Sequence, residues 1–337
     1  KSTTKNLGFD FTFLQSRLTF TADIFERKVT DILIPGGKDY PALIGDDDLP
    51  FENAGILKTT GFELQAKWSD KLANGFRYSV GVALSDDKAK VVSYPSNPTN
   101  KIGDGVLYKG YTVGDIWGYV TGGILQEGDF DGVGANGKPL YHGPYFKGGQ
   151  AYPGYIWYQD LDHDGVITTG LNTVDDPGDR KVIGNNAPRY RYNITANFQY
   201  KGFDLDLMFQ GVGKRDYWLS STSSYWGNGA GSWEVYNNSW TPERTDAKFP
   251  MYGSGTGSYP QTGYLLDASY IKLKQVILGY TFPRALINKI GLEKLRLNLA
   301  AYNLFTISDM PKYYDADYLS DAYPPKRTFS VGIQVGF

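Results

Sequence analysis

A short acidic segment carries the residues best suited to chemistry in this sequence. Asp160, Asp162 and Asp164 alternate with Leu and His, and Gly165 follows directly. Alternate carboxylates in a tight turn converge on one point, and a hard cation such as Ca²⁺ takes roughly six to eight oxygen ligands of this kind. Gly165 permits the sharp turn, and the carbonyl oxygen of Val166 would be the next ligand. The spacing predicts a bound divalent cation, Ca²⁺ rather than Mg²⁺, in a structural role.

The last ligand of this predicted site is left open by the spacing. Leu171 stands where a calcium loop usually has its closing Glu. Asp175, Asp176 or Asp179 must therefore supply the carboxylate from beyond an insertion. A solvated acidic turn without a metal is the alternative, because Asp and Gly are ordinary turn residues.

Little else in the sequence suits catalysis or nucleic-acid binding. There is no Cys, and the only two histidines, His142 and His163, have no evident catalytic partner. Because a nucleophile needs a neighbouring base, we predict that the protein is not an enzyme. A formal net charge of −2 gives no basic footprint for nucleic acid.

The elements that position the acidic segment are predicted to be long β-strands. Between Arg327 and Phe337, apolar residues alternate strictly with Thr, Ser, Gly and Gln. Alternation over about ten residues is the length and period of one tilted transmembrane strand. Eight more segments have the same period, at about 7–13, 18–24, 62–68, 76–84, 190–200, 203–210, 267–282 and 295–301, with a bulge expected near residues 271–273.

The connections between these segments alternate in length. Short ones are expected at 14–16, 70–75, 201–202 and 283–292, and long ones at about 29–56, 87–188, 212–265 and 304–326. Short turns on one side and long loops on the other are typical of an outer-membrane barrel. We therefore predict an all-β fold, a transmembrane antiparallel β-barrel with long extracellular loops. A large soluble β-protein would alternate too, but it would not predict the loop lengths or the aromatic residues at strand ends.

Nine strands do not make a complete bacterial barrel, in which the strand number is even. Open edges in lipid would leave backbone groups unpaired. The remaining strands are therefore expected from sequence outside residues 1–337, which we interpret as a C-terminal portion of a longer protein.

Several motifs, in order along the chain, resemble the C-terminal part of SusC/RagA-like TonB-dependent outer-membrane transporters. The resemblance covers essentially the whole chain. The motifs are 53–63 (NAGILKTTGFE), 160–167 (DLDHDGVI), 179–184 (DRKVIG), 188–190 (PRY), 200–205 (YKGFDL), 209–211 (FQG), 270–280 (YIKLKQVILGY), 303–306 (NLFT) and 323–332 (YPPKRTFSVG).

The resemblance implies a 22-stranded barrel of which these are the last nine strands, with a plug and a TonB box that are not in this chain. It implies active import of oligomeric nutrients in a Gram-negative outer membrane, with a SusD-like lipoprotein lid and TonB as partners. It assigns the closing metal ligand to Asp179, which precedes Arg180, although residues 168–178 are longer than the usual spacing. It also gives Phe337 the role of the terminal aromatic used in outer-membrane insertion.

The long loops are rich in aromatic residues that could contact cargo or a lid. Rings flanked by Asn and Asp suit sugar faces, but they equally suit packing or a protein interface. The candidates are Trp117, Trp157, Tyr158, Trp226 and Trp233. We expect a glycan cargo first and an oligopeptide second. The competing hypothesis is a soluble, calcium-stabilised, carbohydrate-binding β-protein.

Overall fold

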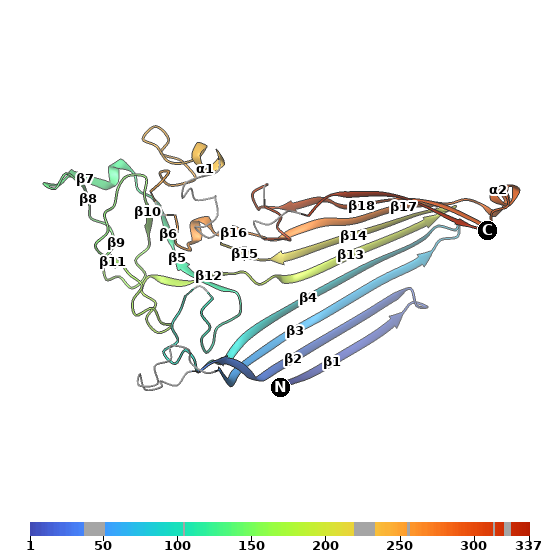
Figure 1. Ribbon diagram of the computed structural model, residues 1–337, viewed down its shortest axis with the longest axis horizontal. Helices are drawn as coiled ribbons and strands as arrows, with labels where there is room; N and C mark the ends of the chain where they lie inside the picture. Colours follow the sequence, from blue (N-terminus) through green and yellow to red (C-terminus); the bar gives the residue numbers. More distant parts are fainter. Residues whose placement is uncertain (37–50, 104, 219–232, 255–256, 313, 320–324) are drawn as a thin grey trace.

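One long antiparallel sheet dominates the computed structural model (Figure 1). The structure describes residues 1–36, 51–103, 105–218, 233–254, 257–312, 314–319 and 325–337. The sheet has nine strands in chain order, which confirms the predicted number: β1 (Ser2–Phe13), β2 (Leu18–Pro35), β3 (Phe51–Lys71), β4 (Arg77–Ser93), β13 (Arg189–Tyr200), β14 (Phe203–Lys214), β17 (Tyr270–Thr281), β18 (Lys294–Ser308) and β19 (Thr328–Gly336). No helix among the described residues is long and apolar enough to cross a bilayer.

Tight turns join the strands at one end of the sheet. Lys201 and Gly202 link β13 to β14, and Tyr200 pairs directly with Phe203. Both turn residues have positive φ, 48° and 88°. Such a turn matches the right-handed twist of its strands and favours glycine. The turn that alternation placed at residues 201–202 is therefore confirmed.

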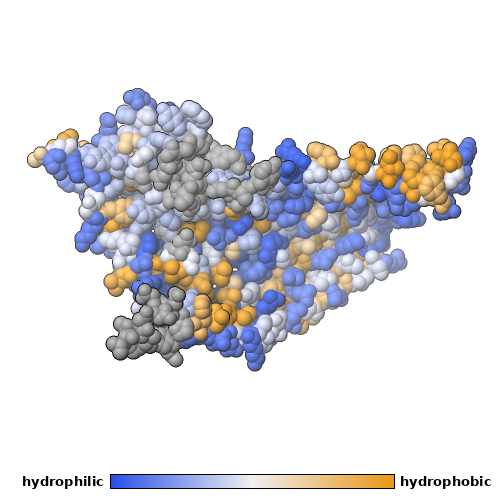
Figure 2. Space-filling view, viewed as in Figure 1, coloured by the Kyte–Doolittle hydropathy of each residue, from blue (hydrophilic) through white to orange (hydrophobic). Residues whose placement is uncertain are grey.

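One face of the sheet carries apolar side chains that lack protein cover. In β19, Phe329, Val331 and Ile333 are 71%, 76% and 67% exposed. In Figure 2 apolar residues gather along the C-terminal strands. The opposite face, which we call the polar face, carries Thr21, Glu63, Gln65 and Asn193 among others. An exposed apolar face backed by a polar one is the pattern of a barrel wall between lipid and lumen.

The strands continue further into the expected loops than alternation indicates. β2 reaches Pro35 and β3 begins at Phe51, so the connection expected at 29–56 is shorter. Two register shifts interrupt the β2–β3 ladder after Val29, and Asp31 has a φ of 57°. These bulges break the alternation of apolar and polar residues. The sequence pattern therefore does not indicate the outer parts of β2 and β3. The bulge expected near residues 271–273 is confirmed, because the β17–β18 register shifts just after Leu273.

The long connections fold into small elements at the other end of the sheet (Figure 1). Five two-stranded sheets form there: β5 (Asp115–Tyr119) with β12 (Arg180–Asn185), β6 (Thr121–Ile124) with β10 (Ile156–Tyr158), β7 (Phe130–Val133) with β8 (Pro139–Tyr141), β9 (Tyr145–Phe146) with β11 (Val166–Ile167), and β15 (Asp216–Tyr217) with β16 (Leu266–Asp267). Helix α1 (Trp233–Asn237) and the 3-10 turns η2 (Glu127–Asp129) and η3 (Thr262–Tyr264) lie there too, whereas α2 (Arg284–Ile287) and η4 (Asn288–Ile290) join β17 to β18.

These connections have a hydrophobic core of their own, which we call the loop core. The β4–β13 connection supplies Tyr119, Ile156, Tyr158 and Ile167, and the β14–β17 connection supplies Val235, Phe249 and Tyr264. Gln261 Nε2 donates a hydrogen bond to the hydroxyl oxygen of Tyr158 at 3.0 Å within this core. The loop core fixes the two connections against each other and positions the acidic turn beside them.

Candidate functional site

The acidic turn brings three carboxylates together. Oxygens of Asp160, Asp162 and Asp179 all lie within 4.8 Å of one another. Asp179 therefore reaches the other two from beyond the insertion, and Asp175 and Asp176 are not in this group. Because three carboxylates converge on one point, the arrangement suits a hard divalent cation.

Backbone amides hold the first carboxylate in place. The N–H groups of His163 and Gly165 donate to the two oxygens of Asp160, at 2.7 Å and 2.8 Å. Gly165 has a φ of 84°, the left-handed region that favours glycine. The chain can therefore curl around the Asp160 side chain, as the sequence pattern requires.

Asp179 closes the turn from inside the loops. Its side chain is fully buried, and its two oxygens accept the N–H groups of Leu161 at 2.8 Å and Thr168 at 2.7 Å. The next residue, Arg180, begins β12, which pairs with β5. The carboxylate thus ties both flanks of the acidic turn to a strand of the loop region.

The remaining predicted ligands lie differently. Asp164 is outside the group of three, and its Oδ1 accepts the N–H of Val166 at 2.8 Å. Val166 begins β11, which pairs with β9. The three converging carboxylates fit a cation. Asp164 instead stabilises the backbone of the turn through its hydrogen bond from Val166.

The crowding of the carboxylates is reflected in their pKa values. Desolvation, followed by repulsion from Asp179 and Asp164, raises the pKa of Asp162. Desolvation also acts to raise the pKa of Asp160, but the hydrogen bonds from Gly165 and His163 outweigh it and leave that pKa lowered. The cluster therefore holds negative charge that a cation would stabilise.

Three of the five aromatic candidates are used in packing. Tyr158 is 1% exposed in the loop core, so its ring has no surface to offer a cargo or lid. Trp117 donates from Nε1 to the Tyr108 hydroxyl at 3.0 Å and packs against that ring. The Trp157 ring lies over Gly122, where an added Cβ would come within 2.3 Å of it.

The other aromatic candidates have different surroundings. Trp233, at the start of α1, is 77% exposed and meets the ring of Tyr236 edge-on. Trp226 lies outside the described residues. Phe337 is 88% exposed at the end of β19. Trp233 is therefore the aromatic candidate with an open surface in the described part of the chain.

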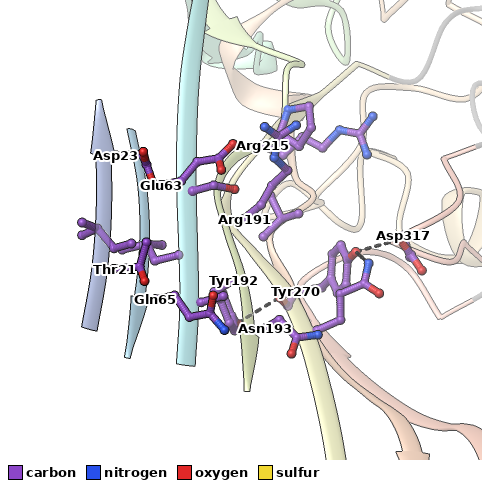
Figure 3. A pocket seen from close by; sticks show the side chains of 18 residues that line it. Thr21, Asp23, Glu63, Gln65, Arg191, Tyr192, Asn193, Arg215, Tyr270 and Asp317 are labelled. Carbon is purple, nitrogen blue, oxygen red and sulfur yellow. Dashed lines mark hydrogen bonds between the residues drawn. The ribbon is translucent and has the colours of Figure 1, made fainter. Parts of the chain in front are cut away.

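A recess on the polar face was not predicted from the sequence. It has a volume of about 750 Å³. Its charged lining residues are Asp23, Glu63, Arg191, Arg215 and Asp317, and Figure 3 shows them with the neighbouring polar side chains. The alternation places Glu63 on the polar face, but nothing local in the sequence brings Arg215 to it.

A buried lysine fastens the β18–β19 connection to the polar face near this recess. Lys272 is 1% exposed and forms ion pairs with Asp315 and Asp317. The Tyr270 hydroxyl donates to Asp317 Oδ1 at 2.7 Å. We call these four residues the lysine latch. The sequence alone predicts only a bulge near Lys272, because the two Asp partners lie more than 40 residues further along the chain.

Comparison with known proteins gives relatives of one kind. No protein-family model matches the chain. TonB-dependent receptor P3 of Formosa agariphila is 28% identical over 359 residues, covering 98% of this chain and 34% of the relative. TonB-dependent receptor SusC of Bacteroides thetaiotaomicron is 26% identical over 359 residues, covering 100% of this chain and 32% of the relative. The chain spans about a third of the length of the curated relatives it matches.

The fold has a close counterpart among solved structures. The RagAB peptide importer in its open-open state superposes with a TM-score of 0.74 at 20% identity, covering 100% of this chain and 34% of that chain. At this identity the match concerns the fold, an antiparallel sheet with long loops at one end. The resemblance read from the sequence is thereby confirmed: over nearly all of its length, this chain is similar to TonB-dependent receptors of the SusC/RagA kind.

Proposed function

We propose that this chain is part of the wall and outer loops of a TonB-dependent importer of oligomeric nutrients in a Gram-negative outer membrane. The observation that carries the proposal is the nine-stranded meander with its exposed apolar face, joined to similarity with TonB-dependent receptors over 98% of the chain. Lipid would cover the apolar face, and the polar face would line the lumen.

The sheet supports completion by further strands. β1 and β19 are its two outer strands, so each has one edge without a partner in the described sheet. In lipid each unpaired backbone group costs several kcal/mol. Further strands would close the wall into the proposed 22-stranded barrel, residues 1–337 would contribute its final portion, and a plug from the same transporter would fill the lumen.

The proposed partners follow from the same relationship. A SusD-like surface lipoprotein would cover the long loops, and TonB would supply energy through the part of the transporter that carries the plug. Trp233, exposed beside Tyr236, is the loop aromatic best placed for contact with a lid. Tyr and Trp are enriched at such interfaces.

A structural Ca²⁺ in the acidic turn belongs to this proposal. Asp160, Asp162 and Asp179 would hold it, because their oxygens already converge. The ion would supply charge neutralisation and would fix the start of β12 relative to the turn. Its role would be to stabilise the loops, not to react with cargo.

An uptake experiment tests the function. Cells producing the full-length transporter and its neighbouring lipoprotein would be offered labelled oligosaccharide and oligopeptide mixtures, with and without TonB. We expect uptake that disappears without TonB, and a protein that needs detergent for purification. A detergent-free soluble species that binds carbohydrate in a calcium-dependent manner would instead support the binding-protein hypothesis.

A further inference from the structure

Three lysines lie next to one another on the apolar face, where β2, β3 and β4 approach the loops (Figure 1). Lys28 of β2 pairs directly with Lys58 of β3, and Lys58 pairs directly with Lys90 of β4. Lys28 is four residues from the exposed Ile24, and Lys90 is eight from the exposed Val82, with no register shift in between. Because side chains alternate between faces, all three lysines project from the apolar face. We call them the rim lysines.

The rim lysines have little negative charge around them. Lys58 forms an ion pair with Glu26 at 2.8 Å, and neither of the other two forms an ion pair with a described residue. The next row of the same face adds Lys5 and Lys88 on either side of Glu26. Asp86, also on this face, is already bound by an arginine. Like charges directly opposite one another destabilise a sheet, so an anion from outside the chain would stabilise this surface.

The rim lysines are separated from the turn end of the sheet by one membrane crossing. In β3, Lys58 lies ten residues from Trp68. Trp68 Nε1 donates to the Tyr78 hydroxyl at 3.1 Å, and Trp and Tyr side chains of this kind are enriched at a membrane interface of a barrel. A tilted transmembrane strand needs about 9–11 residues to cross the bilayer. The rim lysines would therefore reach the opposite interface, at the level of the lipid headgroups.

The rim lysines are confined to one part of the wall. Near the loop end of β18, Phe305 and Ile307 are 43% and 63% exposed. At the same end of β19, the exposed side chain is that of Phe329. These strands present apolar groups at the end of the sheet where β2, β3 and β4 present lysines. The positive charge is therefore a local feature of three adjacent strands, which is the property expected of a binding site.

The spacing of the rim lysines suits a phosphate group. The Cβ atoms of directly opposed residues are about 4.5–5.5 Å apart, so neighbouring ammonium groups can reach one anion, and lysine binds phosphate as a point charge. The exposed side chains of Leu7, Phe9 and Ile24 lie on the same face toward the turn end, where acyl chains would cover them. A lipid that carries phosphate matches both parts of this surface, whereas a soluble anion matches only the lysines.

We propose that the rim lysines bind the phosphate groups of a lipid in the outer leaflet of the membrane, with its acyl chains along the apolar face. This inference rests on the proposed function, which places the sheet in a membrane, and it adds a ligand site that import of cargo does not itself require. An acidic lid protein fits less well, because the lysines project from the lipid side of the wall, beside exposed apolar side chains, and not over the lumen.

Native mass spectrometry of the full-length transporter in detergent would test the site. The probes are lipid A with its phosphates, the same lipid after the phosphates are removed, and inorganic phosphate. We expect the wild type to bind the phosphorylated lipid at least about tenfold more tightly than the dephosphorylated one, and equimolar inorganic phosphate not to displace it. Lys28→Gln, Lys58→Gln and Lys90→Gln together should abolish this preference and leave binding of the dephosphorylated lipid unchanged. The corresponding three Lys→Arg changes should preserve the preference.

A matched control removes the same charge elsewhere. Lys138→Gln, Lys147→Gln and Lys181→Gln together alter exposed positions of the β4–β13 connection, and lipid binding should match the wild type. If the site fails, TonB-dependent uptake in cells producing the glutamine variant of the rim lysines would leave the proposed function standing. Equal binding of the two lipids by the wild type, or an unchanged preference in that variant, would overturn the inference. So would a lower unfolding temperature of the lipid-free variant, because the rim lysines would then neutralise acidic groups of the transporter itself.

Discussion

The ammonium group of Lys272 lies 2.9 Å and 3.0 Å from the two carboxylate oxygens of Asp315. Because the lysine is in β17 and the aspartate in the β18–β19 connection, this contact fastens a loop to the sheet. Lys272 is almost fully buried, so the contact is shielded from water.

Removing Lys272 should release this connection. Lys272→Met leaves Asp315 and Asp317 close together without their buried cation, and breaking a buried pair costs about 3–5 kcal/mol. We expect much faster limited proteolysis of residues 309–319 in the full-length protein. The control is Lys274→Met, whose side chain is 35% exposed and whose loss should cost under about 1 kcal/mol. Equal cleavage of the two variants would contradict the latch.

The latch should also respond to acid. Desolvation alone would raise the pKa of Asp317, but the hydrogen bond from Tyr270 and the charge of Lys272 outweigh it and hold that pKa below 3.8. A lowered pKa contributes stability above pH 3.8, and this stability is lost as the pH falls through the folded-state value. Hydrogen exchange of the connection should therefore be flat from pH 7 to 5, after correction for intrinsic rates, and its protection should fall below pH 3.8. Loss of protection already at pH 6 would show that another group controls the contact.

Metal binding should depend on the three converging carboxylates. Asp179→Asn and Asp160→Asn should each weaken calcium binding, measured by calorimetry on chelator-treated full-length protein. Calcium at a hundred times its dissociation constant should stabilise the loops by about 2.7 kcal/mol. The matched control is Asp131→Asn, an exposed acid paired with His142. Unchanged calcium affinity in both cluster variants would rule out the site.

The loop core should be sensitive at Tyr158. Tyr158→Ala removes a ring that is 1% exposed and should cost about 3–5 kcal/mol. Tyr158→Phe keeps the ring but removes one acceptor of Gln261 Nε2, which still donates to the Tyr259 carbonyl oxygen at 3.1 Å, so the cost should be about 0.5–1.5 kcal/mol. The unfolding temperature of the loop region should be lowest for Tyr158→Ala, intermediate for Tyr158→Phe and highest for the wild type. Trp233→Ala, at a 77% exposed position, should stay within about 0.5 kcal/mol of wild type.

Two adjacent positions in β19 test which face meets lipid. Val331 is 76% exposed on the apolar face, and Ser330 lies on the polar face. Val331→Lys should destabilise the assembled barrel by about 2–4 kcal/mol, whereas Ser330→Lys should be tolerated. Heat-modifiable electrophoretic mobility of the full-length protein would report assembly. The opposite ranking would place lipid on the other face.

The strands could be predicted from the sequence because their signal is local. Apolar and polar residues alternate within each strand, and turn residues such as Lys201 and Gly202 mark the ends. Where bulges break the alternation, as after Val29, the predicted strand ends before the observed one. The acidic turn was visible for the same reason, since Asp160, Asp162 and Gly165 lie within six residues.

The rest depends on contacts that sequence spacing does not encode. Arg215 meets Asn186 from 29 positions away, and Lys272 meets Asp315 across 43. The sequence pattern did not show that Tyr158 is buried, because its neighbours in the loop core come both from distant parts of its own connection and from the β14–β17 connection. Such pairings follow from the order of strands in the sheet, which single-residue patterns do not specify.

The shared loop core has an evolutionary consequence. Trp240 donates to Gln126 at 2.9 Å, and Gln261 bonds to Tyr158, so each connection completes the interior of the other. Surface loops usually accept insertions and deletions independently. Here a change of length in one connection would open a gap or a clash in its neighbour. The two segments should therefore be inherited as one unit, and a chimaera between relatives should fold only when both are exchanged together.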